Sequence, residues 1–457
     1  MKNKSKEPPR IAVKLANIVF VLGILFSILL IVYAIYKMYN PPEPVSPVFY
    51  IIIMLSGGVF ATFFGLGLKR LSNNLKVNLS VLFFSVGITV YGLETYLQFY
   101  KKNPQTEAEI VAKHMGVSYD TRTKMEVLKD LRDSGVEAFP NFNPKAFSKS
   151  NGLTAKKGRI YPLGTISNII TVFDSETGSY PIIETDEHGF NNSKGLYNKN
   201  KVDIILTGDS FTEGTIHSNE SISAVLRQLN FNAISIGKAA NGSLAELAAL
   251  KEYAEPLEPR IVLWLYYGND LEEDLRGEMK SSILRKYLNE SDYSQNLISR
   301  QEEIDDVLKN YTQIIRKEKK KKLLKLTKLR KMINLLPAPT PISTSIPRSI
   351  FRDILSKSRQ MVSGWNGKMY LVYLPSFERY STDSEDPNRD FVMQTAAELD
   401  IPVIDIQSKV FDLHLDPLSL FPFRISNHYN SLGYRLVAEA IGKRLEADCY
   451  VPIKSKK

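Results

Sequence analysis

The fold is decided by residues 202–214, VDIILTGDSFTEG. Five of the first six side chains are apolar or β-branched, which is typical of a buried strand, and the run stops at a glycine. Asp209 and Ser210 follow that glycine, and a helix-like segment begins near Glu220. A serine on the turn after a parallel strand can act as a nucleophile, because backbone N–H groups nearby can stabilise a developing oxyanion. The stretch therefore predicts a reactive serine, provided that its partners follow later in the chain.

Three later segments supply such partners. A short strand at 232–236 leads through a loop of small residues to a helix from about Ser243. The apolar strand in RIVLWLYYGNDL ends at Asn269, and His428 stands just ahead of an amphipathic helix. In an open α/β sheet, the loops after successive strands converge at the carboxyl edge. We therefore expect Asn269 and His428 to meet Ser210.

These segments resemble the SGNH, or GDSL-type, hydrolase superfamily. GDSF at 208–211 matches its nucleophile block, and the loop 237–242 matches its glycine block. The tripeptide 268–270 matches its asparagine block, and HYNSLGYRLVAEAI from His428 matches its histidine block. The four blocks stand in the correct order over about 201–444, which is far more specific than any one motif. The resemblance implies an α/β fold, a flavodoxin-like three-layer sandwich with a parallel sheet.

The resemblance also implies a role for each residue. Ser210 would be the nucleophile and His428 the general base. The Ser210 N–H, a loop N–H near Gly242 and the Asn269 side-chain amide would form the oxyanion hole. The family's usual GxxG spacing is not kept, because its second glycine is Ala240 here and Gly242 lies two residues further on. Ala240 is therefore an alternative backbone donor.

The acid that would orient the histidine is not at its usual place. The family places an aspartate three residues before the histidine, and Ile425 stands there. Asp405, at the end of the strand-like segment 401–406, and Asp416 are candidates. A Ser–His dyad helped by a backbone carbonyl is an equal alternative, since the acid only orients the imidazole and stabilises its cation.

No metal site and no cofactor are expected. His114, His188 and His414 show neither HExxH nor paired-ligand spacing, and we interpret His217 as a loop or rim residue. Nothing matches a Walker A loop or a dinucleotide fingerprint. The single cysteine, Cys449, excludes an intrachain disulfide.

Three apolar runs at 15–36, 48–68 and 79–99 predict a membrane anchor over 1–100. Each run exceeds twenty residues, and a helix rising about 1.5 Å per residue then spans the roughly 30 Å hydrocarbon core. Lysines and arginines cluster before the first run and between the second and third. This distribution predicts a cytoplasmic amino terminus in the inner membrane, with the remainder on the periplasmic or extracellular side. Two lysines after the third run argue the other way.

The rest of the chain is expected to form an accessory region and a catalytic domain. We expect residues 101–200 to form a helix and β-hairpins that pack on the core. We expect residues 201–450 to form the SGNH domain, with an insertion at about 271–347. The insertion contains RKEKKKKLLKLTKLRK at 316–331, which supplies much of the formal charge of +10. This run is either a solvated helical arm or, as the tether favours, a membrane-surface helix. A nucleic-acid partner is not expected.

Taken together, these features predict a membrane-anchored serine esterase or O-acyltransferase. The acyl-serine would be resolved by water or by a sugar hydroxyl, and family analogy favours an acylated cell-envelope polysaccharide as substrate. The expected partners are the bilayer, a carbohydrate or acyl-ester substrate, and polysaccharide biosynthesis machinery. The alternative is a catalytically inactive glycan-binding or assembly protein. Ile425 supports that alternative, whereas the presence of Ser210, Asn269 and His428 argues against it.

Overall fold

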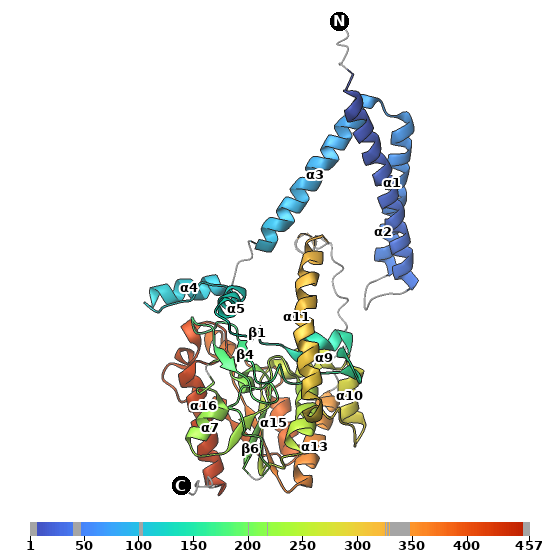
Figure 1. Cartoon of the computed structure of the whole chain (residues 1–457). Helices are drawn as coiled ribbons and strands as arrows, with labels where there is room; N and C mark the ends of the chain where they lie inside the picture. The colour runs from blue at the N-terminus through green and yellow to red at the C-terminus, as the bar shows by residue number, and fades with distance from the viewer. Residues whose placement is uncertain are drawn as a thin grey trace. The chain divides into compact units, whose positions relative to one another are not determined.

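The chain folds into two compact units in this computed structural model. The helical unit comprises residues 1–103 and 314–344, and the sheet unit comprises 104–313 and 345–457. The described residues are 7–39, 47–99, 104–199, 201–216, 218–324, 326, 329 and 348–450, so His217 lies outside them. Figure 1 shows the elements of each unit.

Three apolar helices dominate the helical unit: α1 (Arg10–Tyr39), α2 (Pro47–Arg70) and α3 (Asn73–Phe99). Each is long and apolar enough to cross a membrane, as the sequence predicts. Small residues let α1 and α2 approach closely. A Cβ atom on Gly23 would lie 2.8 Å from the Phe64 ring, and one on Gly57 would lie 2.8 Å from Ile31 Cγ1. The orientation in the membrane stays a prediction.

The basic run at 316–331 is only partly described. Helix α11 (Gln301–Leu324) includes its first residues, and beyond that helix only residues 326 and 329 of the run are described. Its contact with a membrane surface therefore stays a prediction.

A five-stranded, fully parallel sheet forms the centre of the sheet unit, in the order β10-β9-β8-β6-β7. All six residues of the central strand β8 are buried, which explains its continuous apolar sequence. The strands are β6 (Ile204–Thr207), β7 (Ala233–Ser235), β8 (Ile261–Tyr266), β9 (Lys368–Tyr373) and β10 (Val403–Asp405).

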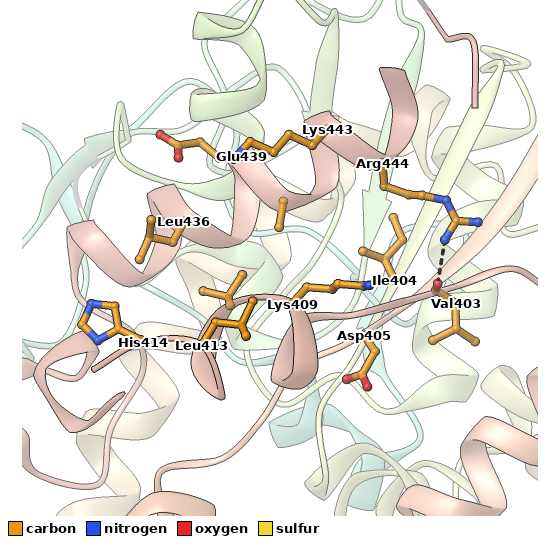
Figure 2. A pocket seen from close by; sticks show the side chains of 12 residues that line it. Val403, Ile404, Asp405, Lys409, Leu413, His414, Leu436, Glu439, Lys443 and Arg444 are labelled. Atoms are coloured by element: carbon orange, nitrogen blue, oxygen red, sulfur yellow. Dashed lines mark hydrogen bonds between the residues drawn. The ribbon is translucent and has the colours of Figure 1, made fainter. Parts of the chain in front are cut away.

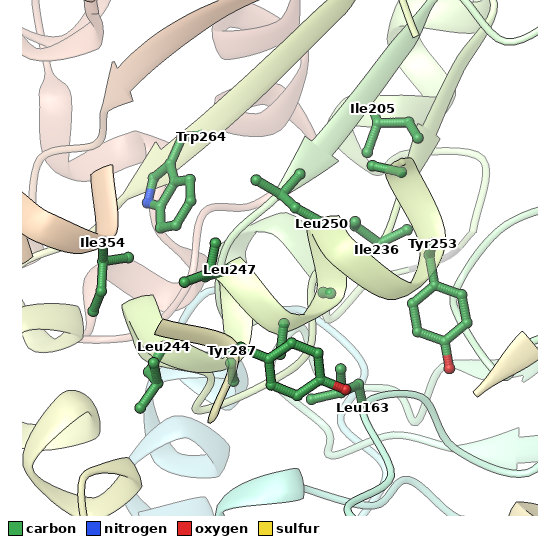
Figure 3. Close-up of a cluster of buried hydrophobic side chains, with 14 of the residues drawn as sticks. Leu163, Ile205, Ile236, Leu244, Leu247, Leu250, Tyr253, Trp264, Tyr287 and Ile354 are labelled. Carbon is green, nitrogen blue, oxygen red and sulfur yellow. The ribbon is translucent and has the colours of Figure 1, made fainter. Parts of the chain in front are cut away.

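Helices cover both faces of this sheet, because successive strand residues point to opposite sides. Ile205 and Trp264 belong to one buried cluster with residues of α8 (Ser243–Ala249) and α13 (Arg348–Gly364), part of which Figure 3 shows. Ile204 and Leu206 belong to the opposite cluster, with residues of α7 (Ile222–Gln228) and α16 (Ser431–Ala447). The α/β fold with a three-layer arrangement is therefore confirmed.

The accessory region lies in the same unit as the sheet. It forms a small sheet in the order β1-β4-β5 and a hairpin of β2 and β3. Its elements are α4 (Pro104–His114), α5 (Lys124–Asp133), β1 (Ala138–Pro140), β2 (Leu153–Ala155), β3 (Gly158–Ile160), β4 (Ile170–Val172) and β5 (Ile182–Glu184). Further α-helices of the sheet unit are α6 (Ser210–Glu213), α9 (Leu275–Glu278), α10 (Ser282–Asn289), α14 (Phe377–Ser381) and α15 (Arg389–Glu398).

A buried asparagine pair fastens the accessory region to the main sheet. The Asn192 side chain donates to Ser235 O at 2.8 Å and accepts from Ser235 N at 2.8 Å, so it bonds the outer edge of β7. The Asn191 amide donates at 3.0 Å to the carbonyls of Glu213 and Gly214, at the end of α6. A sheet edge that would otherwise expose its backbone is thereby closed, and the turn that carries Ser210 is held from outside the core.

Replacing Asn192 by alanine is expected to destabilise the sheet unit by about 2–4 kcal/mol, because buried backbone groups of Ser235 lose their partners. Both tryptophans of the chain, Trp264 and Trp365, lie in this unit, so their fluorescence during thermal unfolding of the full chain measures the effect. The control is Asn219→Ala, at an exposed asparagine, which should leave the unfolding midpoint unchanged. Equal midpoints for both variants would contradict the role of Asn192.

Candidate active site

Ser210 lies at the start of α6, directly after β6. Gly208 makes the turn between them possible, since a Cβ atom there would lie 2.1 Å from Thr212 Oγ1 and 2.9 Å from Leu265 O on β8. Asp209 caps the short helix, with its Oδ1 accepting from Phe211 N at 2.9 Å. The strand, the glycine and the cap together place the serine hydroxyl at the carboxyl edge of the sheet.

His428 meets this serine although 218 residues separate the two in sequence. The distance from His428 Nε2 to Ser210 Oγ is 2.6 Å, within hydrogen-bond range. His428 stands just before α16, whose cap Asn430 accepts from Gly433 N at 3.0 Å and so fixes the entry of the chain into the helix. The Phe211 ring packs against the imidazole, with centroids 4.6 Å apart.

Glu176 completes the arrangement. It lies in the loop between β4 and β5, and both of its carboxylate oxygens are 2.8 Å from His428 Nδ1. Thr215 Oγ1 donates to Glu176 Oε2 at 2.8 Å and holds the carboxylate in place. Since a carboxylate accepts, Nδ1 carries a hydrogen, and the neutral ring then presents Nε2 as an acceptor to the serine hydroxyl. The geometry is that of a Ser–His–Glu triad.

Two opposing effects set the pKa of His428. Burial lowers it, whereas the charge of Glu176 and the hydrogen bond to it raise it, with smaller contributions from Asp209 and Glu213. The net result is a pKa above the ordinary 6.5. The imidazole is therefore a stronger base than a free histidine, and its cation is stabilised once formed.

The expectation that Asp405 or Asp416 orients His428 is wrong. Asp405 ends the edge strand β10 and accepts from Arg389 at 2.7 Å. It lines a hollow of about 420 Å³ between β10 and α16, beside Lys409 (Figure 2). Asp416 pairs with Arg424. The dyad alternative fails as well, because Glu176 occupies the position of the acid.

No sequence pattern identifies Glu176, because it precedes His428 by 252 residues and lies outside the segment that resembles the SGNH family. The loop sequence FDSETGSY at 173–180 contains two acids, and no spacing rule distinguishes them. Only the fold shows that Glu176 reaches the histidine, whereas Asp174 pairs with Lys124.

Asn269 lies where the sequence predicts, directly after β8. The turns after β6 and β8 are in contact, since the rings of Phe211 and Tyr267 are 4.3 Å apart. Asn269 Nδ2 donates one hydrogen to Asp274 Oδ2 at 2.7 Å. A side-chain amide carries two hydrogens, and within the described part of the chain the second has no acceptor. It is available to a ligand.

The backbone N–H of Gly242 is not available in the same way. It donates to Glu278 Oε1 at 2.6 Å, and the other oxygen of Glu278 accepts from Leu244 N and Ala245 N. Gly242 is required for close approach, since a Cβ atom there would lie 2.6 Å from Leu275 N. The expectation that Gly242 supplies an oxyanion donor is therefore not met.

Ala240, the alternative donor, has different surroundings. Its φ of 58° is left-handed, an unfavourable conformation for alanine. The two residues before Ala240 are held by a buried ion pair between Lys238 and Glu213 and by a 2.8 Å bond from Ala239 N to Glu213 Oε2. Among the described residues, the Ala240 N–H has no acceptor. It remains the candidate backbone donor of this loop.

The other described histidines have local structural contacts. His114 Nδ1 bonds Ile110 O, His414 Nδ1 accepts from Asp416 N, and the His188 ring packs on Tyr197. No group of three or more His, Cys, Asp or Glu side chains within the described residues is arranged to hold a metal ion.

Replacing Glu176 by glutamine should lower the pKa of His428, because the carboxylate charge, the largest effect that raises this pKa, is lost and burial remains. NMR titration of ring-labelled histidine in the full chain measures this pKa, with His428 assigned from a His428→Ala sample. Glu184→Gln, at an exposed carboxylate on the same hairpin, should leave it unchanged. An unchanged His428 pKa in Glu176→Gln would contradict the described contact.

The solved structures that resemble this chain include hydrolases. No protein-family model matches the chain, and no curated protein matches it. Among solved structures, the lipase/acylhydrolase from Enterococcus faecalis is 12% identical over 54% of this chain and 96% of that one, with a TM-score of 0.33. The acetyl xylan esterase AlAXEase is 13% identical over 53% and 100%, with a TM-score of 0.33. A member of the lipolytic protein G-D-S-L family from Veillonella parvula is 15% identical over 55% and 100%, with a TM-score of 0.32. The structural neighbours of this chain are thus GDSL-type lipolytic hydrolases and an acetyl xylan esterase, to which it is similar over about half its length.

Proposed function

We propose that this chain is a membrane-anchored serine esterase or O-acyltransferase. The observation that carries the proposal is the continuous hydrogen-bonded chain from Ser210 Oγ through His428 to Glu176, with a 2.6 Å contact at the serine. An alcohol is a weak nucleophile at neutral pH and becomes effective when an oriented base removes its proton. This arrangement provides such a base.

The first half-reaction forms an acyl-serine. Ser210 Oγ attacks an ester carbonyl while His428 Nε2 takes the hydroxyl proton, and Glu176 stabilises the resulting imidazolium. The negative charge on the carbonyl oxygen is met by N–H donors, for which we propose Ser210 N, Ala240 N and the free hydrogen of Asn269. The intermediate then collapses, and the departing alkoxide takes the proton from His428.

The second half-reaction releases the acyl group. His428 removes a proton from water or from a sugar hydroxyl, and the resulting oxygen nucleophile attacks the acyl-serine. Water gives hydrolysis, and a sugar hydroxyl gives transfer. Ser210 recovers its proton from His428 in both cases, so each cycle ends with the starting enzyme. The described residues supply every proton transfer.

We propose an acylated cell-envelope polysaccharide as the substrate, with the sheet unit on the outer side of the inner membrane. The three apolar helices support a membrane location, and the resemblance of the four sequence blocks to the SGNH family supports acyl-ester chemistry. The alternative of a silent glycan-binding protein depended on the absent acid at Ile425. Glu176 removes that support, because it supplies the carboxylate from another part of the chain.

The full chain should react covalently with a fluorophosphonate probe, and Ser210→Ala and His428→Ala should abolish this labelling. Glu176→Gln should slow labelling roughly 10²–10⁴-fold, since loss of the acid leaves the histidine in the wrong tautomer and its cation unsupported. Peptide mapping by mass spectrometry identifies the labelled residue.

Glu184→Gln, on the same hairpin, should label at the wild-type rate. A folded wild-type chain that remains unlabelled would overturn the proposed activity. Labelling that maps to a residue other than Ser210 would overturn the assignment of the nucleophile.

A further inference from the structure

A second chain of contacts leads from the accessory region to the candidate oxyanion site. Lys145 forms an ion pair with Asp274 Oδ1, and Asp274 Oδ2 accepts from Asn269 Nδ2 at 2.7 Å. The Asp274 side chain is 1% exposed and the Lys145 side chain 31%. The two oxygens of one buried carboxylate therefore connect a lysine of the accessory region to the amide that follows β8.

The backbone around Lys145 is fixed by its own contacts. Asn143 Oδ1 accepts from Lys145 N at 2.9 Å, and the Tyr161 hydroxyl donates to Pro144 O at 3.0 Å. Phe147, two residues further on, is buried in the main core. These contacts hold the backbone of Lys145 in place, and its ammonium group reaches Asp274 from that fixed backbone.

The contact with Asp274 has two consequences for the Asn269 amide. The carboxylate accepts one amide hydrogen, which fixes the direction of the other. Its negative charge, however, would repel an oxyanion that develops beside Asn269. Asp274 lies near other buried carboxyl groups. Burial raises the pKa values of Glu246, Asp270 and Glu278, and the charge of Asp274 raises them further. A cation on the other oxygen of Asp274 offsets this repulsion.

We propose that Lys145 is a positioning residue for the reaction. Acting through Asp274, it aims the Asn269 amide at the oxyanion and neutralises the carboxylate that lies beside it. This inference rests on the proposed function, because it assigns a role within the same site. It extends the site to a residue that does not touch the substrate and that no motif indicates.

The test uses the full chain and the hydrolysis of p-nitrophenyl acetate. Lys145→Met should lower kcat roughly 10- to 100-fold with little change in KM, less than the about 10²–10³-fold loss on removing an oxyanion donor. Lys145→Arg should keep most of the activity, because a guanidinium group also pairs with the carboxylate. Lys156→Met, at an exposed lysine of the same region, should leave kcat unchanged.

Double variants separate the charge from the hydrogen bond. Adding Asp274→Asn to Lys145→Met should restore much of kcat, since neutral asparagine still accepts the Asn269 hydrogen without repelling the oxyanion. Adding Asp274→Leu should not restore it, because leucine has no acceptor. A lysine with a purely structural role would not give this difference. The asparagine double variant also leaves no unpaired buried charge, so it tests the inference even if Lys145→Met folds poorly.

The possible outcomes show whether the role of Lys145 fails alone or together with the proposed function. Wild-type hydrolysis that depends on Ser210, with an unchanged kcat in Lys145→Met, would overturn the role of Lys145 and leave the proposed function standing. Equal rates in the two double variants would overturn the positioning of Asn269. A folded wild-type chain that neither hydrolyses the ester nor labels with fluorophosphonate would overturn both.

Discussion

The site depends on one contact, the hydrogen bond between Glu176 and His428. It joins a hairpin loop of the accessory region to the segment just ahead of α16. The contact fixes the imidazole so that Nε2 faces Ser210, and it raises the histidine pKa against the effect of burial. The small sheet carries the loop with Glu176, and the cap of α16 fixes the segment with His428, so the two hold opposite sides of this bond. The accessory region therefore contributes a residue to the site itself and does not merely surround it.

The sequence predicts the parts of the site whose position depends on local structure. Ser210, Asn269 and His428 each follow a strand or precede a helix, and a parallel sheet places such residues at one edge. The α/β fold class follows from the resemblance of the four sequence blocks to the SGNH family, and the three apolar helices follow from the length of their apolar runs. These features are set within short segments, and a single sequence contains all the information that they require.

The sequence does not predict the parts that depend on tertiary contacts. Glu176 becomes the acid only because a hairpin loop reaches His428, and Asp405 is excluded only because β10 lies at the far edge of the sheet. Gly242 matches a family position, yet its N–H donates to Glu278, which lies 36 residues later in the chain. Packing between distant segments decides which carboxylate contacts which donor. The local sequence around a carboxylate is the same whether or not that contact forms.

The separation of Glu176, Ser210 and His428 along the chain has a consequence for biosynthesis. A ribosome makes the acid loop first, then the serine turn, and the histidine last of the three. Contacts this distant in sequence form late, after the intervening strands have paired. In the proposed mechanism, a chain that lacks the segment with His428 carries a serine without its base. The proposed mechanism therefore requires that the segment carrying His428 be made and docked before Ser210 can react.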